Sequence, residues 1–201
     1  MSKMITSYKT IANATESYFR DRGSKFLGYA FPFEDAEDLK QYLDPLKKEH
    51  PKAVHHCYAY RIGTDGLVFR ANDDGEPSGS AGAPILGQID SMELTNVLVI
   101  IVRYFGGTLL GVPGLINAYK ETTLLALEKA QIVKKIIEHH AILQFDYPQM
   151  NDVMQIIKQN NIRIKKQNLG LDCKIHIAIP LKQKDHVLDL IDKMHLINLI
   201  Q

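Results

Sequence analysis

Hydrophobic and polar residues alternate in several ways along this chain, and each pattern predicts a different element. The segment VLVIIV at 97–102 is apolar at every position, which is typical of a strand buried on both faces. Shorter apolar or alternating runs bounded by turn residues predict further strands. Together we predict strands at residues 24–31, 54–61, 67–71, 97–102 and 132–137, the last closing the unit. We predict helices at 34–49 and from Ser78 or Ser80 as N-cap to 89, and a further helix with Pro113 near its start.

The remainder of the chain repeats strand and helix patterns in a compact order. Strands are predicted at 141–146, 162–166, 171–179 and 196–200, and helices at 148–160 and 182–194. The resulting order β-α-β-β-α-β is that of a ferredoxin-like domain. We therefore predict an α+β protein of two domains, 1–138 with an α/β sandwich and 139–201 with a ferredoxin-like fold.

Composition limits the classes of function. A hydrophobic fraction of 45% and a net charge of +1 over 201 residues describe an ordinary globular chain without a global attraction to nucleic acid or membrane. Two cysteines exclude a disulfide framework and a CxxC metal site. The N-terminus lacks the apolar core of a signal peptide, and no apolar run spans a bilayer, so we expect a cytoplasmic location.

The residues at the end of the apolar strand are the strongest candidates for a ligand-binding site. Arg103, Tyr104 and Phe105 precede a loop with Gly106, Gly107, Gly111 and Gly114, and Lys120 follows on the next helix. Arginine can bind phosphate through two N–H groups, aromatic rings can stack on bases, and glycine lets a backbone approach a ligand. Alternation turns Tyr104 away from Arg103, and Phe105 is also a candidate for the core. Neither GxxxxGK[ST] nor GxGxxG is present, so a P-loop or dinucleotide fold is not supported.

Three acids, Asp73, Asp74 and Glu76, lie close together in a loop with glycine and proline. Such a cluster can hold a hard cation or perform acid–base chemistry, although it does not match an EF-hand. The favoured alternative is a structural loop that caps the next helix and pairs with a cation such as Arg103.

Two further sets of residues follow from strand alternation. His55 and Cys57 share one face of a strand and His56 the other, so the three cannot hold one metal, and a core cysteine is favoured. In the second domain, alternation places Lys174 and His176 opposite the apolar residues, with Arg163 and Lys165 on the same open face. A solvated face and a binding surface both remain open for this basic set.

At these residues the chain resembles the IMPACT/YigZ family. The resemblance rests on HHCYAYRIG at 55–63, NDDGEPSGSAGAPIL at 72–86 and VIIVRYFGGTLLGVPGLINAYK at 99–120. It implies a first domain with the ribosomal-protein-like fold found also in ribonuclease PH, and a second domain like the last domain of elongation factor G. It implies a cytoplasmic protein that binds nucleic acid or translation components. The motif positions carried over are Asp73, Asp74, Gly75, Glu76, Gly79, Arg103, Tyr104, Gly106, Gly107 and Gly111. The kinase-regulating role of eukaryotic members depends on an extra N-terminal domain and is not carried over.

The leading hypothesis is a non-enzymatic protein that binds RNA or the ribosome, with no catalytic residue, cofactor, metal or membrane contact. Arg103 and Lys120 would contact phosphate, Tyr104 would stack or shape the site, and Gly106 and Gly107 would admit the ligand. Asp73, Asp74 and Glu76 would orient Arg103, and the second domain would extend the contact through Arg163, Lys165 and Lys174. The alternatives are a hydrolase or transferase using the acidic loop with Mg²⁺, and a module that docks on a translation factor.

Overall fold

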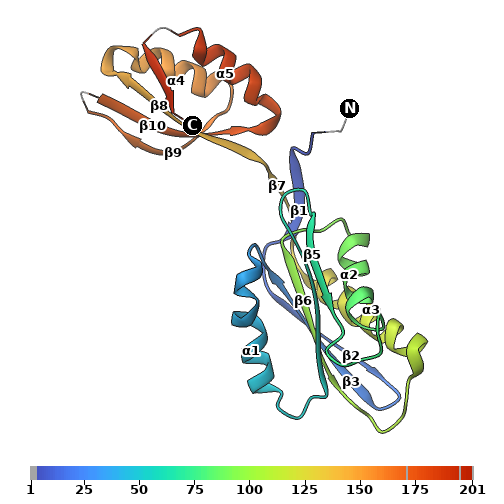
Figure 1. Cartoon of the computed structure of the whole chain (residues 1–201). Helices are drawn as coiled ribbons and strands as arrows, with labels where there is room; N and C mark the ends of the chain where they lie inside the picture. The colour runs from blue at the N-terminus through green and yellow to red at the C-terminus, as the bar shows by residue number, and fades with distance from the viewer. Residues whose placement is uncertain (1–3, 171, 195, 201) are drawn as a thin grey trace. The chain divides into compact units, whose positions relative to one another are not determined.

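The computed structural model describes residues 4–170, 172–194 and 196–200. The chain divides into two compact units (Figure 1). The first unit is Tyr8–Lys135, and the second contains the residues from Ile136 onward with the segment that precedes Tyr8. Both units combine helices with antiparallel sheet, so the predicted α+β class is confirmed.

A five-stranded sheet forms the centre of the first unit, in the order β2-β3-β6-β4-β5. Its strands are β2 (Thr15–Asp21), β3 (Ser24–Pro32), β4 (His55–Ile62), β5 (Val68–Asn72) and β6 (Val97–Tyr104). Every neighbouring pair is antiparallel. The predicted strands at 24–31, 54–61, 67–71 and 97–102 are therefore confirmed, each with slightly shifted ends.

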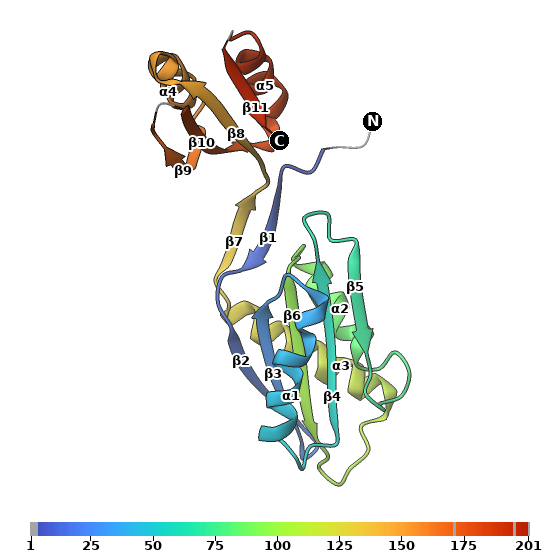
Figure 2. The ribbon, with the colours of Figure 1, turned by 60° about the vertical axis from the view of Figure 1, so that its left-hand side comes forward.

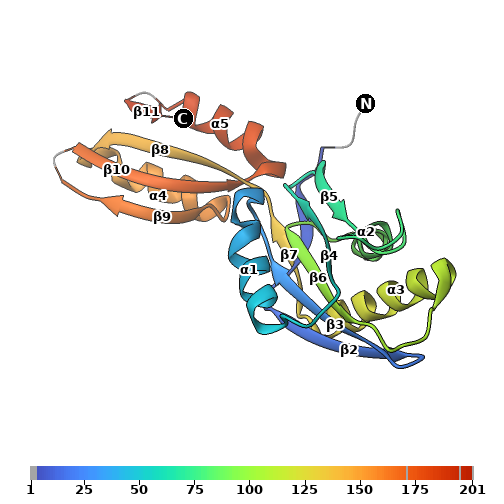
Figure 3. The same ribbon diagram turned by 60° about the horizontal axis from the view of Figure 1, so that its bottom comes forward.

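Helices cover both faces of this sheet, which explains the fully apolar strand. One face carries α1 (Leu39–Glu49), and the other carries α2 (Gly82–Ser91) and α3 (Gly111–Lys129), as Figures 2 and 3 show. Alternate residues of β6 enter two separate cores, Val97, Val99 and Ile101 on the α2/α3 face and Leu98, Ile100 and Val102 on the α1 face. Burial on both sides thus arises here in an antiparallel sheet.

Two predictions about element ends were wrong. The predicted helix at 34–49 begins later, because Asp35 caps a short 3₁₀ turn at Ala36–Asp38 before α1 starts. Neither Ser78 nor Ser80 caps α2. Its N-cap is Ala81, and the N–H groups of Ala81 and Gly82 donate to the distant Asp73 carboxylate. The prediction that the acidic loop caps the next helix is therefore confirmed, with Asp73 as the residue that accepts these hydrogen bonds.

The predicted strand at 132–137 exists as β7 (Ile132–Ile136), but it does not close the main sheet. It pairs instead with β1 (Ser7–Ile11) in a separate two-stranded sheet. The sequence analysis did not predict β1 or β2. β2 is long and alternating, and hydroxyls of Thr15 and Ser17 donate to carbonyls of α3, which fixes that strand against the helix.

The second unit has the predicted element order β-α-β-β-α-β. It comprises β8 (Glu138–Asp146), α4 (Met150–Gln159), β9 (Arg163–Asn168), β10 (Asp172–Pro180), α5 (Lys184–Asp192) and β11 (Ile197–Ile200). The sheet order is β11-β8-β10-β9, and its core includes Cys173, Ile175, Ile177 and Ile179, as alternation predicts. Among the described residues of either unit, no helix combines the length and apolar character that crossing a membrane requires.

Candidate functional site

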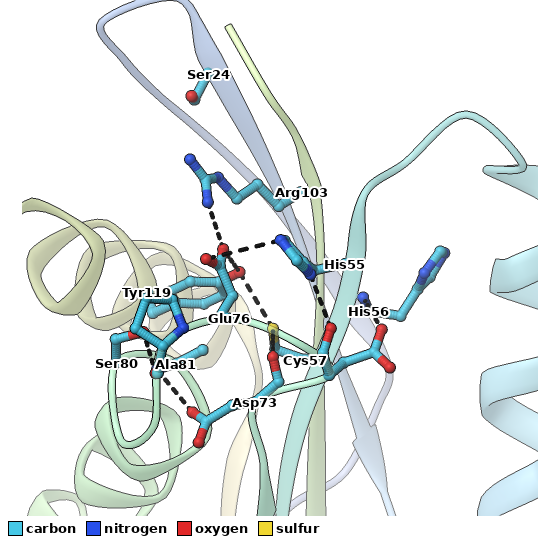
Figure 4. Close-up of polar contacts among 12 residues, drawn as sticks. Ser24, His55, His56, Cys57, Asp73, Glu76, Ser80, Ala81, Arg103 and Tyr119 are labelled. Carbon is cyan, nitrogen blue, oxygen red and sulfur yellow. Dashed lines mark hydrogen bonds and ion pairs between the residues drawn. The ribbon is translucent and has the colours of Figure 1, made fainter. Parts of the chain in front are cut away.

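A buried hydrogen-bonded network joins four elements of the first unit near the end of β6 (Figure 4). Glu76 Oε1 accepts from Arg103 Nη1 at 2.5 Å and from the Tyr119 hydroxyl at 2.8 Å. The side chains of Arg103 and Glu76 are only 6% and 3% exposed. Removing two charges from water is costly unless they pair, and this geometry provides both the ion pair and an added hydrogen bond.

Cys57 extends the network into the core. Its Sγ lies 3.2 Å from the Tyr119 hydroxyl and 3.1 Å from the Asp73 carbonyl oxygen. Burial raises the pKa values of both the Cys57 thiol and the Tyr119 hydroxyl well above their usual ranges. The predicted core cysteine is confirmed, because Cys57 is fully buried and remains a thiol rather than a reactive thiolate.

The acidic loop is held by its own carboxylates. Asp73 accepts hydrogen bonds from the backbone N–H groups of Gly79, Ala81 and Gly82. Burial acts to raise the pKa of Asp73, but these three hydrogen bonds outweigh it and hold the pKa below its usual value. Asp74 Oδ2 accepts from the His56 N–H at 2.6 Å. The three acids therefore diverge, with only Glu76 reaching Arg103.

A pocket of about 520 Å³ lies beside this network on the α2/α3 face. Its polar floor is formed by His55, Glu76 and Arg103. Its apolar wall is formed by Val54, Pro77, Phe105, Leu109, Leu110, Val112 and Leu115. His55 Nδ1 lies 2.7 Å from the Asp74 carbonyl oxygen, so it must donate there, and His55 Nε2 lies 3.7 Å from Glu76 Oε2. Within the described ranges, no group of three or more His, Cys, Asp or Glu side chains is arranged to hold a metal ion.

A second hollow, of about 470 Å³, lies on the α1 side of the same strand end. It is lined by Tyr18, Gly23, Lys25, Leu27, His50, Tyr104 and Phe105. His50 lies between two tyrosines, with Nε2 2.8 Å from the Tyr29 hydroxyl and Nδ1 2.9 Å from the Tyr104 hydroxyl. Burial, with the nearby acids Glu49 and Glu16, raises the pKa of Tyr29 to about 12. The imidazole therefore fixes the orientation of Tyr104 at one wall of the hollow.

The structure separates the residues that the sequence analysis had grouped around Arg103. Arg103 is buried on the α2/α3 face, whereas Tyr104 lines the hollow on the opposite face, as alternation predicts. Phe105 is 48% exposed and borders both cavities, so it is not part of the core. Lys120 is exposed on α3 and is not among the lining residues of either cavity, so the expected shared mouth with Arg103 does not form.

The glycines of the loop have two different roles. Gly106 lies against the backbone of Gly23 and Ser24, where a β-carbon would overlap, and its N–H donates to Ser24 Oγ. Gly107 has a φ of 86°, which favours glycine, and a β-carbon there would meet no atom. Packing thus explains Gly106, and backbone conformation explains Gly107.

The sequence analysis missed Tyr18, Lys25 and Tyr119. Tyr18 and Lys25 come to the second hollow from β2 and β3, and strand pairing puts Lys25 opposite Tyr104. The alternation of β2 was an available signal. No sequence signal distinguished Tyr119, because a buried tyrosine in an apolar helix resembles any other core residue.

The open face of the second unit is less basic than expected. Arg163 pairs with Glu138, and Lys174 lies 3.7 Å from Asp172. A bulge in the β9–β10 pairing sets Lys166, and not Lys165, opposite His176. Simple alternation therefore fails at Lys165, and acids partly neutralise this face.

Comparison with known proteins identifies the chain. Residues 22–127, just over half of its length, match the model of the Impact N-terminal domain. The chain belongs to the IMPACT family. The matched region contains the acidic loop, the Arg103 network, the pocket on the α2/α3 face and every lining residue of the second hollow except Tyr18.

Similarity to IMPACT relatives extends into the second unit. An IMPACT family member of Haemophilus influenzae is 35% identical over 163 residues, which cover 80% of this chain and 78% of the relative. The IMPACT family member YvyE of Bacillus subtilis is 30% identical, over 81% of this chain and 75% of its own length. The IMPACT family member YigZ of Escherichia coli is also 30% identical, over 78% of this chain and 78% of its own length. A crystal structure of a hypothetical protein aligns over 98% of both chains, with a TM-score of 0.71 and 26% identity.

Proposed function

We propose that this IMPACT protein is a cytoplasmic regulator of translation that binds single-stranded RNA of the translation machinery through the hollow beside Tyr104. The observation that carries the proposal is the combination of aromatic rings and a cation around that hollow. Tyr18, Tyr104 and Phe105 offer rings, and Lys25 offers an ammonium group. Stacking surfaces beside a positive charge are what proteins use to hold single strands.

The exposure of these groups supports the proposal. Tyr18 is 53% exposed and Phe105 48%, while Tyr104 is half-buried with its hydroxyl held by His50. Lys25 and Arg20 are paired across β2 and β3, are both exposed, and form no ion pair within the part of the chain that the structure describes. Two unneutralised cations beside rigid rings favour a phosphate backbone with bases stacked on the rings.

Several residues predicted from the sequence take different roles in this proposed site. Tyr104 keeps its place near the RNA because it lines the hollow, and Gly106 stays close to it because its backbone packs against Gly23, another lining residue. Arg103 becomes a positioning residue, because its guanidinium is buried against Glu76. Lys120, Arg163, Lys165 and Lys174 remain candidate peripheral phosphate contacts. Because the net charge of the chain is close to zero, we expect RNA binding to depend only modestly on salt concentration.

We also propose the two fold relationships that the resemblance implies. The first unit would share the ribosomal-protein-like fold found in ribonuclease PH, and the second that of the last domain of elongation factor G. The β-α-β-β-α-β order of the second unit supports the latter, and residues 1–138 and 139–201 would be the two domains. An enzyme using the acidic loop has less support, because Asp73, Asp74 and Glu76 each accept hydrogen bonds from the protein itself.

The test is fluorescence anisotropy with a labelled single-stranded RNA of about 12 nucleotides across a salt series. Tyr18→Ala should lose about 1–3 kcal/mol of binding free energy, which is the usual value of one stacked base. Lys25→Ala should weaken binding and reduce the salt slope by about one contact. Tyr147→Ala and Lys158→Ala, exposed residues of the second unit, are the matched controls.

Equal binding by wild type, Tyr18→Ala and Lys25→Ala would contradict the proposed site. If wild type binds no RNA but sediments with ribosomes, a protein partner is the better reading. The exposed apolar residues Phe105, Leu109 and Val112 would then be the first surface to mutate.

A further inference from the structure

The pocket on the α2/α3 face contains a buried acceptor that the RNA proposal does not use. Glu76 Oε1 is engaged by Arg103 and Tyr119, whereas among the described residues Oε2 has no hydrogen-bond donor and only the 3.7 Å contact with His55 Nε2 that Figure 4 marks. The Glu76 side chain is 3% exposed, and Glu76 lines the pocket. Oε2 therefore offers the pocket an acceptor that no protein donor occupies, on a side chain that is otherwise buried.

His55 places a second acceptor beside the first. The Asp74 carbonyl oxygen can only accept, so the 2.7 Å contact fixes the proton of a neutral His55 on Nδ1. Nε2 then presents a lone pair 3.7 Å from Glu76 Oε2. Two acceptors at this spacing do not bond each other, but one donor atom can reach both, since each hydrogen bond spans about 2.8–3.0 Å.

The rest of the pocket is apolar. Leu110 and Leu115 are buried in its wall, while Leu109 and Val112 are 81% and 47% exposed at its rim. A ligand that fits must therefore combine a group carrying several hydrogens on one atom with an apolar body. We propose that this pocket binds a primary ammonium group attached next to an apolar group, as at the free N-terminus of a peptide that begins with leucine.

The charges on the floor favour a cation over an anion. Arg103 Nη1 is already held by Glu76, and Arg103 Nε, although it lacks a partner within the described ranges, is itself buried. A ligand in the pocket meets Glu76 Oε2 and, in the neutral imidazole, the lone pair of His55 Nε2 first, and both repel a carboxylate. The Phe105 ring, exposed at the rim, adds a surface that attracts cations.

The experiment is isothermal titration calorimetry of the full chain at neutral pH with four small probes. Leu-Gly-Gly and isoamylamine both carry the ammonium and the branched apolar group, whereas acetyl-Leu-Gly-Gly and isovalerate lack the ammonium. We expect Leu-Gly-Gly and isoamylamine to bind, and the other two to bind at least about tenfold more weakly. Tighter binding of Leu-Gly-Gly than of isoamylamine assigns the pocket to peptide N-termini, and equal binding assigns it to free amines. Binding of isovalerate or the acetylated peptide as tightly as Leu-Gly-Gly, or of no probe, overturns the proposal.

Two variants keep the test independent of folding. Glu76→Gln removes the charge with little change in shape and should weaken ammonium binding about ten- to a hundredfold. Because this change also leaves Arg103 unpaired, Val112→Trp is the second variant, filling the mouth from an exposed position. Leu67→Trp, at an exposed turn away from the pocket, is its control and should bind as wild type does. Unchanged affinity in Val112→Trp would contradict the assignment.

Discussion

The buried pair of Arg103 and Glu76 gives the sharpest prediction about stability. Arg103→Met removes the cation and leaves a carboxylate that is 3% exposed, with the Tyr119 hydroxyl as its remaining donor. Breaking a buried pair by removing one partner costs about 3–5 kcal/mol, because the other charge stays buried and uncompensated. Glu76→Gln should also destabilise the chain, whereas the double variant should cost less than the sum of the two by about 1–3 kcal/mol.

Urea unfolding followed by tyrosine fluorescence measures this cost. Eight of the nine tyrosines lie at or before Tyr119, so the signal reports mainly on the first unit. With a slope of about 2 kcal/mol per molar urea, a loss of 4 kcal/mol lowers the midpoint by about 2 M. A midpoint for Arg103→Met within about 0.25 M of wild type, or additive single variants, would refute the reasoning. It follows that lost RNA binding in an Arg103 variant has to be separated from lost folding.

Three other changes test the loops and the core. Asp73→Ala should cost about 1–2 kcal/mol at neutral pH, because it removes the acceptor for the start of α2. The pKa of Asp73 is held low in the folded chain, so its contribution to stability is present above about pH 4 and is lost as the pH falls. The difference in Tm between Asp73→Ala and wild type should therefore shrink in acid. A Tm difference that stays constant with pH would contradict this role of Asp73. Gly106→Ala should cost about 1–3 kcal/mol in thermal unfolding through overlap with the Gly23 backbone, whereas the Gly87→Ala control, which meets no atom, should not. Because burial raises the pKa of the Cys57 thiol, a maleimide should modify it only in urea, and rapid labelling of the native chain would contradict its placement.

Local patterns predicted most of the elements, for reasons visible at particular residues. The continuous apolar run of β6 predicts burial on both faces of that strand, which the structure shows. The alternating pattern of β10 predicts one buried face, and Cys173, Ile175 and Ile177 lie in the core as expected. The separation of Tyr104 from Arg103 follows from the two-residue period of a strand. What failed depended on distant partners. β7 pairs with β1, more than a hundred residues away, instead of closing the main sheet.

The site was harder to predict than the fold. The sequence indicated that the acidic loop caps the next helix and pairs with Arg103, but it could not show which acid does which. The bulge in β9 sets Lys166 instead of Lys165 opposite His176, and no residue pattern in the sequence predicts it. Tyr18 and Lys25 reach Tyr104 only through the order of strands in the sheet, which a sequence read segment by segment does not contain.

The central claim is that RNA binds at the hollow formed by β2, β3 and the end of β6. Titration of the isotope-labelled full chain with single-stranded RNA, followed by amide chemical shifts, tests it most directly. The account predicts that the largest changes cluster at Tyr18, Gly23–Leu27 and Tyr104, with small changes at His55 and Leu109 on the opposite face. Changes confined to α3 around Lys120 or to the open face of the second unit, or no changes at all, would contradict it.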